Sequence, residues 1–245
     1  MKQSFFEIKE NVALTSNVYK MVLEGDTGDI TNCGQFVNIK LEGLFLRRPI
    51  SVCDCVDNQL TIIYKVVGEG TEQMSKMGIG ERLDILTGLG NGYDTGLSGE
   101  SPLLLGGGVG VPPMYMLCKK LIGEGKKVTV ILGFNTKDEL FYEKEFRELG
   151  ATVYVTTVDG SYGARGFVTD AMKNLDYTYF YTCGPEPMLK AVYSASITSG
   201  QFSFEERMGC GFGACMGCSC KTITGYKRIC KEGPVMQKEE ILWEK

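Results

Sequence analysis

The chain has 245 residues, 43% of them hydrophobic, and a formal net charge of −4. This length can bury a substantial core and form more than one domain, whereas the mild acidity and the lack of a basic stripe argue against a nucleic-acid partner. The sequence contains no histidine, which excludes a Ser-His-Asp triad, a His-ligated zinc, a Rieske centre and a haem held by a proximal histidine. Any catalysis is therefore expected to come mainly from a cofactor.

The N-terminal residues MKQSFFEIKENVAL carry charges where a signal peptide has its apolar stretch. No apolar run approaches the roughly 20 residues that a membrane-spanning helix needs. Without an export signal, the ten cysteines are expected to be reduced thiols, some of them ligands, rather than disulfides. We therefore expect a cytoplasmic protein.

The first part of the chain has the pattern of an antiparallel barrel. Short runs rich in Val, Ile, Phe, Leu and Tyr recur between residues 4 and 86, with turn residues between them. Asp57 and Asn58 predict a hairpin turn, and residues 78–80 predict another. No stretch of helical periodicity is apparent, so we expect a β-barrel domain over residues 1–98, with strands at 19–23, 35–41, 50–53, 60–67 and 82–86.

After residue 99 the pattern changes to a strand, a glycine-rich turn and a helix. Residues 102–106 form a short apolar run that leads into the sequence GGGVGVPP and a helical pattern over 114–122. Glycines allow the backbone to approach a pyrophosphate, and the start of a helix presents free N-H groups to it. Such turns also serve simple packing, so the motif alone leaves both interpretations open.

Strands and helices then alternate, which is typical of a parallel sheet. We expect strands at 127–132, 151–156 and 177–181, and helices at 139–149, 167–173 and 186–198. A ligand of such a sheet lies at the carboxyl ends of its strands. Residues 106–110, 133–134 and 183–185 fall there, which predicts an α/β nucleotide-binding domain over residues 99–204.

The remaining residues, 205–245, contain a glycine-rich cysteine motif. Cys210, Cys215, Cys218 and Cys230 have the spacing CxxxxCxxC followed by a distant cysteine, which is typical of a plant-type 2Fe-2S cluster. A structural zinc usually shows two CxxC pairs, and only one is present here, but zinc and a disulfide remain alternatives. Cys220 is interpreted as a small buried residue rather than a ligand.

Three motifs of the barrel region, RRPIS at 47–51, YKVVGEGT at 64–71 and LGNGY at 89–93, resemble the flavin signatures of the ferredoxin-NADP reductase superfamily. Together with GGGVGVPP, the segment CGPEPM at 183–188 and the cysteine motif, the chain resembles the electron-transfer subunits of type 1B dihydroorotate dehydrogenase over essentially every residue. The resemblance implies a flavin-binding β-barrel, a parallel-sheet nucleotide-binding domain and a small C-terminal 2Fe-2S domain.

The resemblance also implies an FAD site. Arg48 would pair with the pyrophosphate, and Ser51 would lie near the flavin ring. The superfamily often has tyrosine where this chain has Ile50, so Tyr64 becomes a candidate for stacking on the ring. The implied FAD residues are Arg48, Pro49, Ile50, Ser51, Ile63, Tyr64, Lys65, Gly70 and Thr71.

For the nicotinamide nucleotide, the resemblance implies a crevice lined by two loops. Cys183 would lie near the nicotinamide, although a cysteine is also a common buried residue at a strand end. Lys137 stands beside Asp138, which favours NAD over NADP. The implied residues are Gly106, Gly107, Gly108, Gly110, Cys183, Gly184 and Pro185, and the implied cluster ligands are Cys210, Cys215, Cys218 and Cys230.

The activity implied by the family is electron transfer without a catalytic side chain. Electrons from dihydroorotate would enter through an FMN-containing catalytic subunit and pass through the 2Fe-2S cluster and FAD to NAD+, in a heterotetramer with two copies of each subunit. A bifurcating ferredoxin-NADP oxidoreductase subunit carries Asp at the first ligand position, so Cys210 favours the dihydroorotate branch. A reductase with a sulfide dehydrogenase, hydrogenase or ferredoxin partner, and a zinc-stabilised redox sensor, remain alternatives.

Apolar residues surround the expected ligands. They either shield the cluster or line the surface that meets the partner, and the sequence does not separate these roles. The residues are Met208, Phe212, Ala214 and Met216.

Overall fold

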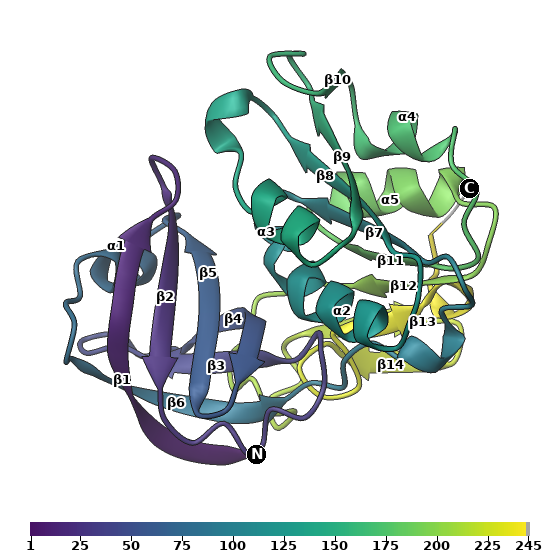
Figure 1. Cartoon of the computed structure of the whole chain (residues 1–245). Coiled ribbons are helices and arrows are strands. Elements are labelled where there is room, and N and C mark those ends of the chain that lie inside the picture. Colours follow the sequence, from purple (N-terminus) through teal and green to yellow (C-terminus); the bar gives the residue numbers. More distant parts are fainter. Residues whose placement is uncertain (244–245) are drawn as a thin grey trace.

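The computed structural model of the chain describes residues 1–243. Figure 1 shows a β-barrel formed by the N-terminal residues beside a twisted sheet with helices on both faces, and the C-terminal residues lie along the lower edge of that sheet. This arrangement confirms the expected combination of an antiparallel barrel and a parallel α/β sheet. The last two residues of the expected 205–245 region lie outside the described residues.

The barrel is closed and has the strand order β1-β2-β5-β4-β3-β6. Its interior is filled by alternate side chains of these strands, among them Phe6, Met21 and Ile62, which are fully buried. The hairpin between β4 and β5 turns at Asp57, which has a φ of 52°, as its turn chemistry predicts. The strands are β1 Lys2–Ala13, β2 Val18–Glu24, β3 Phe36–Lys40, β4 Arg48–Val56, β5 Gln59–Lys65 and β6 Arg82–Leu89.

One helix in the barrel region, α1 (Glu69–Ser75), corrects the all-β expectation for residues 1–98. Its sequence EGTEQMS is short and has no apolar periodicity, so the pattern could not reveal it. The helix is stabilised from outside: Met74 is fully buried in the barrel core, and Asn11 Nδ2 on β1 donates to the Met74 and Met77 carbonyls, both at 2.9 Å. Tertiary contacts thus replace local helix propensity here.

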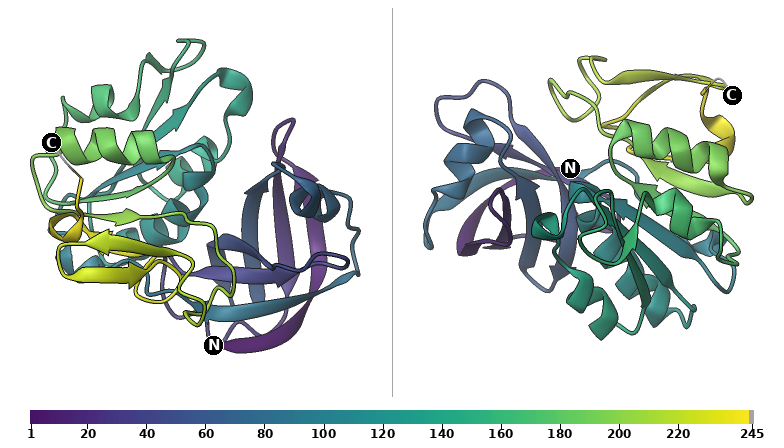
Figure 2. Two further views of the ribbon diagram at one scale, coloured as in Figure 1. Left: turned by 180° about the vertical axis from the view of Figure 1, so that it is seen from behind. Right: turned by 90° about the horizontal axis from the view of Figure 1, so that it is seen from above.

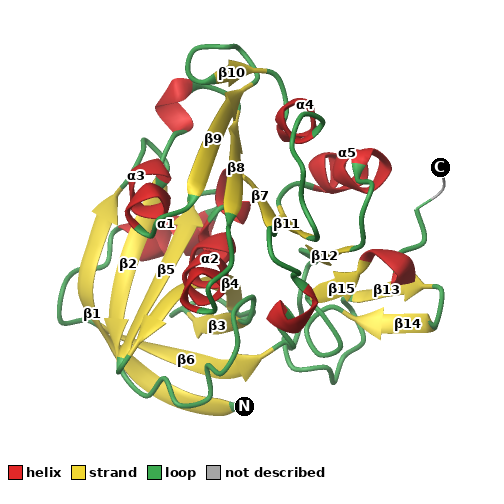
Figure 3. Ribbon diagram, turned by 45° about the vertical axis from the view of Figure 1, so that its right-hand side comes forward, coloured by secondary structure: helices red, strands yellow, loops and turns green. Residues whose placement is uncertain are grey.

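The parallel sheet has the strand order β10-β9-β8-β7-β11-β12-β15. The chain begins at the central strand β7, proceeds outward to β8 and β9, and then returns to the other side of β7 with β11 (Figure 3). The order therefore reverses between β7 and β11, and a ligand crevice is expected at their carboxyl ends. The strands are β7 Leu103–Gly107, β8 Thr129–Phe134, β9 Thr152–Thr157, β10 Ala164–Arg165, β11 Phe180–Cys183 and β12 Gly200–Ser203.

Helices α2 and α3 cover one face of this sheet, and α4 and α5 cover the other (Figure 1). Helix α2 opens with two prolines, whose missing N-H groups would have no partner in a first turn. The helices are α2 Pro112–Gly123, α3 Glu143–Glu148, α4 Val168–Met172 and α5 Glu186–Ala195, with 3-10 turns η1 Thr95–Leu97, η2 Gly108–Gly110 and η3 Lys137–Glu139.

Most elements differ from their expected bounds by a few residues, and two of them begin at least three residues later than expected. The helix expected over 139–149 begins only at Glu143, because Tyr142 before it adopts a left-handed conformation with a φ of 67°. The strand expected over 177–181 begins at Phe180, which is the first residue to pair with β7. The backbone conformation of Tyr142 and the pairing of β11 with β7 set these first residues, and neither is visible in the residue pattern.

The C-terminal segment does not form a separate body. Its strands β13 (Ser219–Thr222) and β14 (Gly225–Arg228) form a hairpin, and β15 (Val235–Gln237) pairs antiparallel with β12 of the α/β sheet. A final 3-10 turn, η4, covers Lys238–Glu240. Figure 2 shows the hairpin beside the sheet and the preceding loop next to the barrel. The cysteine motif is therefore fixed to both of the larger parts.

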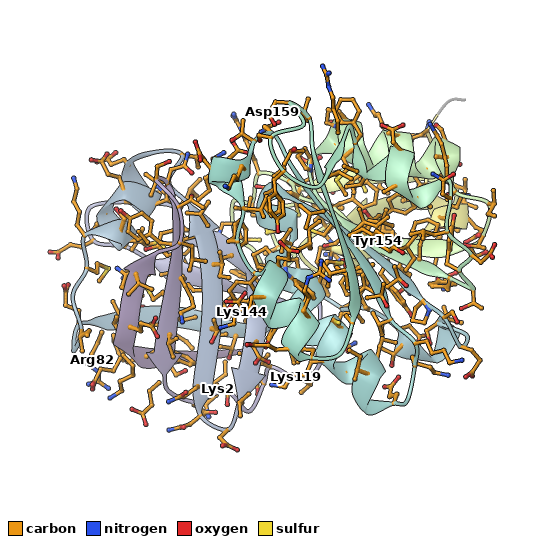
Figure 4. All side chains as sticks on the ribbon, turned by 45° about the horizontal axis from the view of Figure 1, so that its top comes forward. Lys2, Arg82, Lys119, Lys144, Tyr154 and Asp159 are labelled. Carbon is orange, nitrogen blue, oxygen red and sulfur yellow. The ribbon has the colours of Figure 1, made fainter. Side chains whose placement is uncertain are left out.

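The barrel and the α/β sheet share one hydrophobic core at their junction. Cys53 and Ile63 of the barrel pack in the same cluster as Met114 and Leu117 of α2. Lys119 of α2, labelled at this junction in Figure 4, donates to Asp54 Oδ2 at 2.9 Å. This shared core packs the barrel directly against the α/β sheet.

Every helix among residues 1–243 is too short or too polar to cross a bilayer.

Candidate functional site

The residues expected to bind FAD lie where two barrel strands separate. Strands β4 and β5 pair from Val56 and Gln59 as far as Val52 and Ile62. Beyond this point residues 48–51 pair only with β3, while residues 63–65 continue along β2. Backbone groups on the facing edges of such a split have no strand partner, so a ligand can use them. The structure thus brings together the two segments that the resemblance selected.

Arg48 lies against the start of α1. A Cβ added at Gly70 would be 2.4 Å from Arg48 Nε and 3.0 Å from Arg48 Cζ, so the guanidinium rests directly on the glycine backbone. A side chain at this position would displace it. Since a guanidinium is a planar donor suited to phosphate oxygens, Arg48 and the Gly70 backbone form the most cationic part of the split.

The Thr71 hydroxyl is already engaged in this loop. Its Oγ1 accepts from the N-H groups of Val67 at 2.9 Å and Gly68 at 3.3 Å, and it donates to the Gly68 carbonyl at 3.0 Å. The residue is 8% exposed. Thr71 therefore shapes the turn that presents the backbone of α1.

Tyr64 points into the barrel. It is 2% exposed, its ring stacks on Tyr19 with centroids 5.9 Å apart, and its hydroxyl donates to Asn11 Oδ1 at 3.0 Å. Burial raises the pKa of this phenol. The ring has no exposed face for the stacking role that the sequence suggested, so β5 offers a ligand its backbone at this residue.

At the switch point of the parallel sheet, the two expected nucleotide loops touch. A Cβ at Gly110 would lie 2.2 Å from the Cys183 carbonyl oxygen, and a Cβ at Gly107 would lie 2.4 Å from Met188 Sδ. At Gly110 the neighbouring atoms are backbone, so only glycine permits this approach. The close packing provides a structural reason for this glycine, and access for a phosphate stays a prediction.

Cys183 ends β11 beneath this contact. Burial raises the pKa of its thiol to about 12, while a hydrogen bond with Ser203 acts to lower it. The side chain is consequently a neutral thiol near neutral pH rather than a thiolate nucleophile. Its position at the end of β11 places it in the crevice between the loops.

The glycine turn also reaches the barrel, since η2 contacts β5. Residues 108–110 therefore lie beside the strand that carries Ile63 to Lys65. This proximity matters chemically because hydride transfer needs a nicotinamide and a flavin in contact. The candidate nucleotide loop therefore lies next to one side of the candidate flavin split.

The loop after β8 is predominantly acidic. Lys137 is accompanied by Asp138 and Glu139, and the Glu139 carboxylate accepts from Asn135 Nδ2 at 2.9 Å. This loop is where the 2'-position of an adenosine ribose is recognised in such sheets. Its charge disfavours a 2'-phosphate, in agreement with the preference for NAD.

The four expected ligand cysteines form two pairs. Backbone N-H groups of one cysteine in each pair point at the sulfur of the other: Cys215 N lies 3.4 Å from Cys210 Sγ, and Cys230 N lies 3.4 Å from Cys218 Sγ. The N-H of Ala214 also points at Cys210 Sγ, at 3.2 Å. Such N-H donors stabilise sulfur ligands that carry negative charge.

Within residues 1–243, no three His, Cys, Asp or Glu side chains converge on a single ion. Two cysteine pairs can serve the two irons of a 2Fe-2S cluster or one tetrahedral zinc, and the CxxxxCxxC spacing favours the cluster. Cys220 lies outside the pairs, with its Sγ 4.0 Å from Met236 Sδ in the adjoining core. This placement agrees with its interpretation as a packed residue.

The apolar neighbours of the cysteines divide into two kinds. Met208 packs against the core, whereas Phe212 and Met216 are 43% and 53% exposed. Ala214 is exposed as well. Met208 is thus partly buried against the core, whereas the other three residues are open to contact from outside.

Sequence reasoning assigned no individual role to two asparagines that contact the cysteine segment. Asn38 Nδ2 on β3 donates to the Cys210 carbonyl at 3.3 Å, and Asn91, which lies in the LGNGY motif, bonds to the turn after Cys230. Residues far apart in the chain make these contacts, and no local spacing signals them.

Comparisons with known proteins agree with these observations. A family model described as the iron-sulfur cluster binding domain of dihydroorotate dehydrogenase B matches residues 205–242, and one described as the oxidoreductase NAD-binding domain matches residues 104–194. The chain is 45% identical to the dihydroorotate dehydrogenase B (NAD(+)) electron transfer subunit of Fusobacterium nucleatum, over 98% of this chain and 99% of the relative. It is 42% identical to the subunit of the same name from Geobacillus sp. (strain WCH70), over 99% of each.

A solved structure of an NADH-dependent reduced ferredoxin-NADP oxidoreductase, studied for flavin-based electron bifurcation, is also similar. It is 30% identical with a TM-score of 0.89, over 98% of this chain and 90% of that chain.

Proposed function

The chain belongs to the family of dihydroorotate dehydrogenase B electron transfer subunits, and from this premise we propose that it carries electrons between a catalytic partner and NAD+. The cofactors of this role are FAD, a 2Fe-2S cluster and NAD. The observation that carries the proposal is the convergence of three sites. The glycine turn contacts β5, and the cysteine segment contacts β3, which pairs with β4.

Different residues of the chain bind the three cofactors. We assign the FAD pyrophosphate to Arg48 and the Gly70 backbone, and the flavin ring to the split between residues 48–51 and 63–65. NAD occupies the crevice of Gly106 to Gly110 and Cys183 to Pro185, and the cluster is held by Cys210, Cys215, Cys218 and Cys230. When bound, a flavin exchanges hydride with nicotinamide and single electrons with an iron-sulfur cluster, so it links the two kinds of carrier.

The domain assignments follow from these sites. We propose a flavin-binding region over residues 1–98, an NAD-binding region over 99–204 and a cluster-binding region from 205 onward. The pairing of β15 with β12 means that the third region completes the sheet of the second.

The partner is proposed to be the FMN-containing catalytic subunit, assembled as a heterotetramer with two copies of each chain in the cytoplasm. Supporting this, the exposed Phe212 and Met216 lie on the cysteine loop, where a partner must approach for electrons to pass. We place no dihydroorotate site on this chain.

The arginine at the flavin split provides the first prediction. Arg48→Ala removes the charged donor beside Gly70 and is expected to raise the Kd for FAD about ten- to a hundredfold, the cost of losing a hydrogen bond to a charged group. The measurement is flavin content after purification and FAD titration followed by flavin fluorescence. Arg82→Ala is the matched control, because Arg82 lies on β6 over the Phe5 ring. Equal FAD affinity in Arg48→Ala and Arg82→Ala would contradict the assignment.

The function itself is tested by mixing the chain with a dihydroorotate dehydrogenase B catalytic subunit under anaerobic conditions. The expected result is dihydroorotate-dependent reduction of NAD+ that requires both proteins. If the complex forms but NAD+ is not reduced, whereas a ferredoxin is reduced by NADH, the partner assignment is wrong and a reductase of the bifurcating type is favoured. The bifurcating reductase is the second candidate function because the chain resembles the structure of an NADH-dependent reduced ferredoxin-NADP oxidoreductase with a TM-score of 0.89.

A further inference from the structure

Asn91, in the linker after β6, joins the barrel to the cysteine segment. Its backbone N-H donates to the Gly233 carbonyl at 2.7 Å. Its Nδ2 donates to the carbonyls of Glu232 at 3.0 Å and Val235 at 2.7 Å, and the Val235 N-H donates to its Oδ1 at 3.1 Å. One side chain therefore both donates and accepts along a single turn, which an amide does and a carboxylate or hydrocarbon does not.

The turn held by Asn91 directly follows Cys230, which pairs with Cys218. The linker approaches it closely: Gly90 has a φ of +75°, and a Cβ there would lie 2.6 Å from Pro234 Cδ. Two independent features, hydrogen bonding and close packing, thus fix the Cys218 and Cys230 pair to the end of β6.

Asn38 fixes the other pair. It is 1% exposed on β3, its Nδ2 donates to the Cys210 carbonyl at 3.3 Å, and a Cβ at Gly211 would lie 2.3 Å from that nitrogen. Its Oδ1 has no hydrogen-bond partner among residues 1–243. Burying an amide oxygen without a partner costs stability. The polar contact that the Asn38 side chain makes in return is the hydrogen bond to the Cys210 carbonyl.

Asn38 also lies next to the flavin split. Its register partner on β4 is Pro49, which has no N-H, and the Asn38 carbonyl instead accepts from Arg47 Nη1 at 3.3 Å. Arg47 is in turn paired with Asp84 at 3.0 Å. The backbone of Asn38 is therefore tied to Arg47, which directly precedes the proposed FAD residues of β4, and through Arg47 to Asp84 on β6.

The two cysteine pairs are linked to each other through Arg228. Its Nη1 donates to the Gly213 carbonyl at 2.6 Å, in the loop of Cys210 and Cys215, and its Nε donates to Glu232 Oε2 at 2.9 Å, beyond Cys230. The cysteine segment is consequently a single unit attached to the barrel at two points.

We propose that Asn38 and Asn91 are positioning residues that set the separation between the flavin and the cluster, and so the rate at which single electrons pass between them. This inference rests on the proposed function. The physical reason is that electron transfer between bound carriers falls steeply with distance, and a site whose supporting contacts are lost loosens on the scale of an ångström. Neither residue touches the nucleotide crevice, so the step between NADH and flavin depends on them less.

The test compares Asn38→Leu, Asn91→Ala and the control Asn58→Ala in the full chain with its cofactors. Asn58 lies in the β4 to β5 hairpin, and its Nδ2 donates to Glu24 Oε1 at 2.8 Å, far from the cysteine segment in the strand order. Anaerobic rapid mixing with NADH follows the flavin and cluster bands separately. The expected result is cluster reduction slowed about tenfold or more relative to flavin reduction in Asn38→Leu and Asn91→Ala, with the ratio of the two rates unchanged in Asn58→Ala.

A second readout does not depend on activity. Hydrogen exchange of the backbone amides is expected to accelerate about tenfold in residues 209–217 of Asn38→Leu and in residues 231–235 of Asn91→Ala, because opening of the segment becomes easier. Should Asn91→Ala bind less iron than the unaltered chain, both measurements are repeated on Asn91→Asp. This variant keeps the acceptor for the Val235 N-H and loses both donors, so the same slowing and the same faster exchange are expected. Unchanged exchange, or an unchanged ratio of the two reduction rates, would overturn the inference. Absence of flavin reduction by NADH in the unaltered chain would instead refute the proposed function.

Discussion

Cys218→Ala is expected to yield a folded protein that retains FAD but contains almost no iron. Cys218 is 2% exposed, and its Sγ lies 3.4 Å from the Cys230 N. Removing one of four thiolates leaves an iron with an incomplete ligand set, and we expect iron to fall from about two atoms per chain to near zero. The measurement is iron and flavin content together with the EPR spectrum after reduction by dithionite.

Cys220→Ala is the matched control for this variant. Cys220 lies two residues away on β13, and its sulfur packs against Met236 rather than in a cysteine pair. The control is expected to keep its iron. Full iron in Cys218→Ala, or loss of iron only in Cys220→Ala, would show that the ligand set is wrong.

Gly110→Ala is expected to lower kcat/KM for NADH by about a hundredfold, the scale of loss when an ångström-sized displacement disturbs a reacting geometry. The new Cβ would lie 2.2 Å from the Cys183 carbonyl oxygen, so the glycine turn and the loop after β11 must separate. The measurement is NADH oxidation with an artificial electron acceptor that takes electrons from the flavin. FAD content serves as the check that the barrel is intact.

Gly123→Ala provides the comparison for Gly110→Ala, since Gly123 ends α2 and a Cβ there meets no atom within 4 Å. This control is expected to retain its activity with NADH. If Gly110→Ala behaves in the same way, the crevice between the two loops is not the nucleotide site.

Much of the fold could be predicted from local pattern. The barrel strands follow from short β-rich runs separated by turn residues, and β7 with its glycine turn follows from an apolar run that ends in GGGVG. The hairpin at Asp57 and the start of α2 at Pro112 are encoded by single residues whose backbone preferences are strong. In these places local chemistry and the tertiary structure favour the same conformation.

Elements that depend on distant contacts could not be predicted in this way. Helix α1 is capped by Asn11 from β1 and anchored by Met74 in the barrel core, and β15 is a strand because it pairs with β12. The sequence EGTEQMS and the segment VMQ carry little signal by themselves. Tertiary partners overrule propensity in both.

The candidate site also combines features that local sequence encodes with features that depend on distant contacts. The cysteine spacing and the glycine turn are local motifs, and the glycine turn lies between β7 and α2, as its sequence predicted. The inward orientation of Tyr64 and the engagement of the Thr71 hydroxyl depend on Asn11, Tyr19 and the loop before α1. The Asn38 and Asn91 contacts join residues 172 and 144 positions apart, so their discovery requires the folded chain.

The central claim is that one chain connects a nicotinamide to a 2Fe-2S cluster through a flavin. It is tested most directly by anaerobic visible and EPR spectra of the purified protein before and after NADH is added, with iron, zinc and flavin determined on the same sample. We predict about one FAD and two iron atoms per chain, bleaching of the flavin band, and the EPR signal of a reduced 2Fe-2S cluster. Zinc without flavin, or a flavin that NADH bleaches with no cluster signal, would contradict the account.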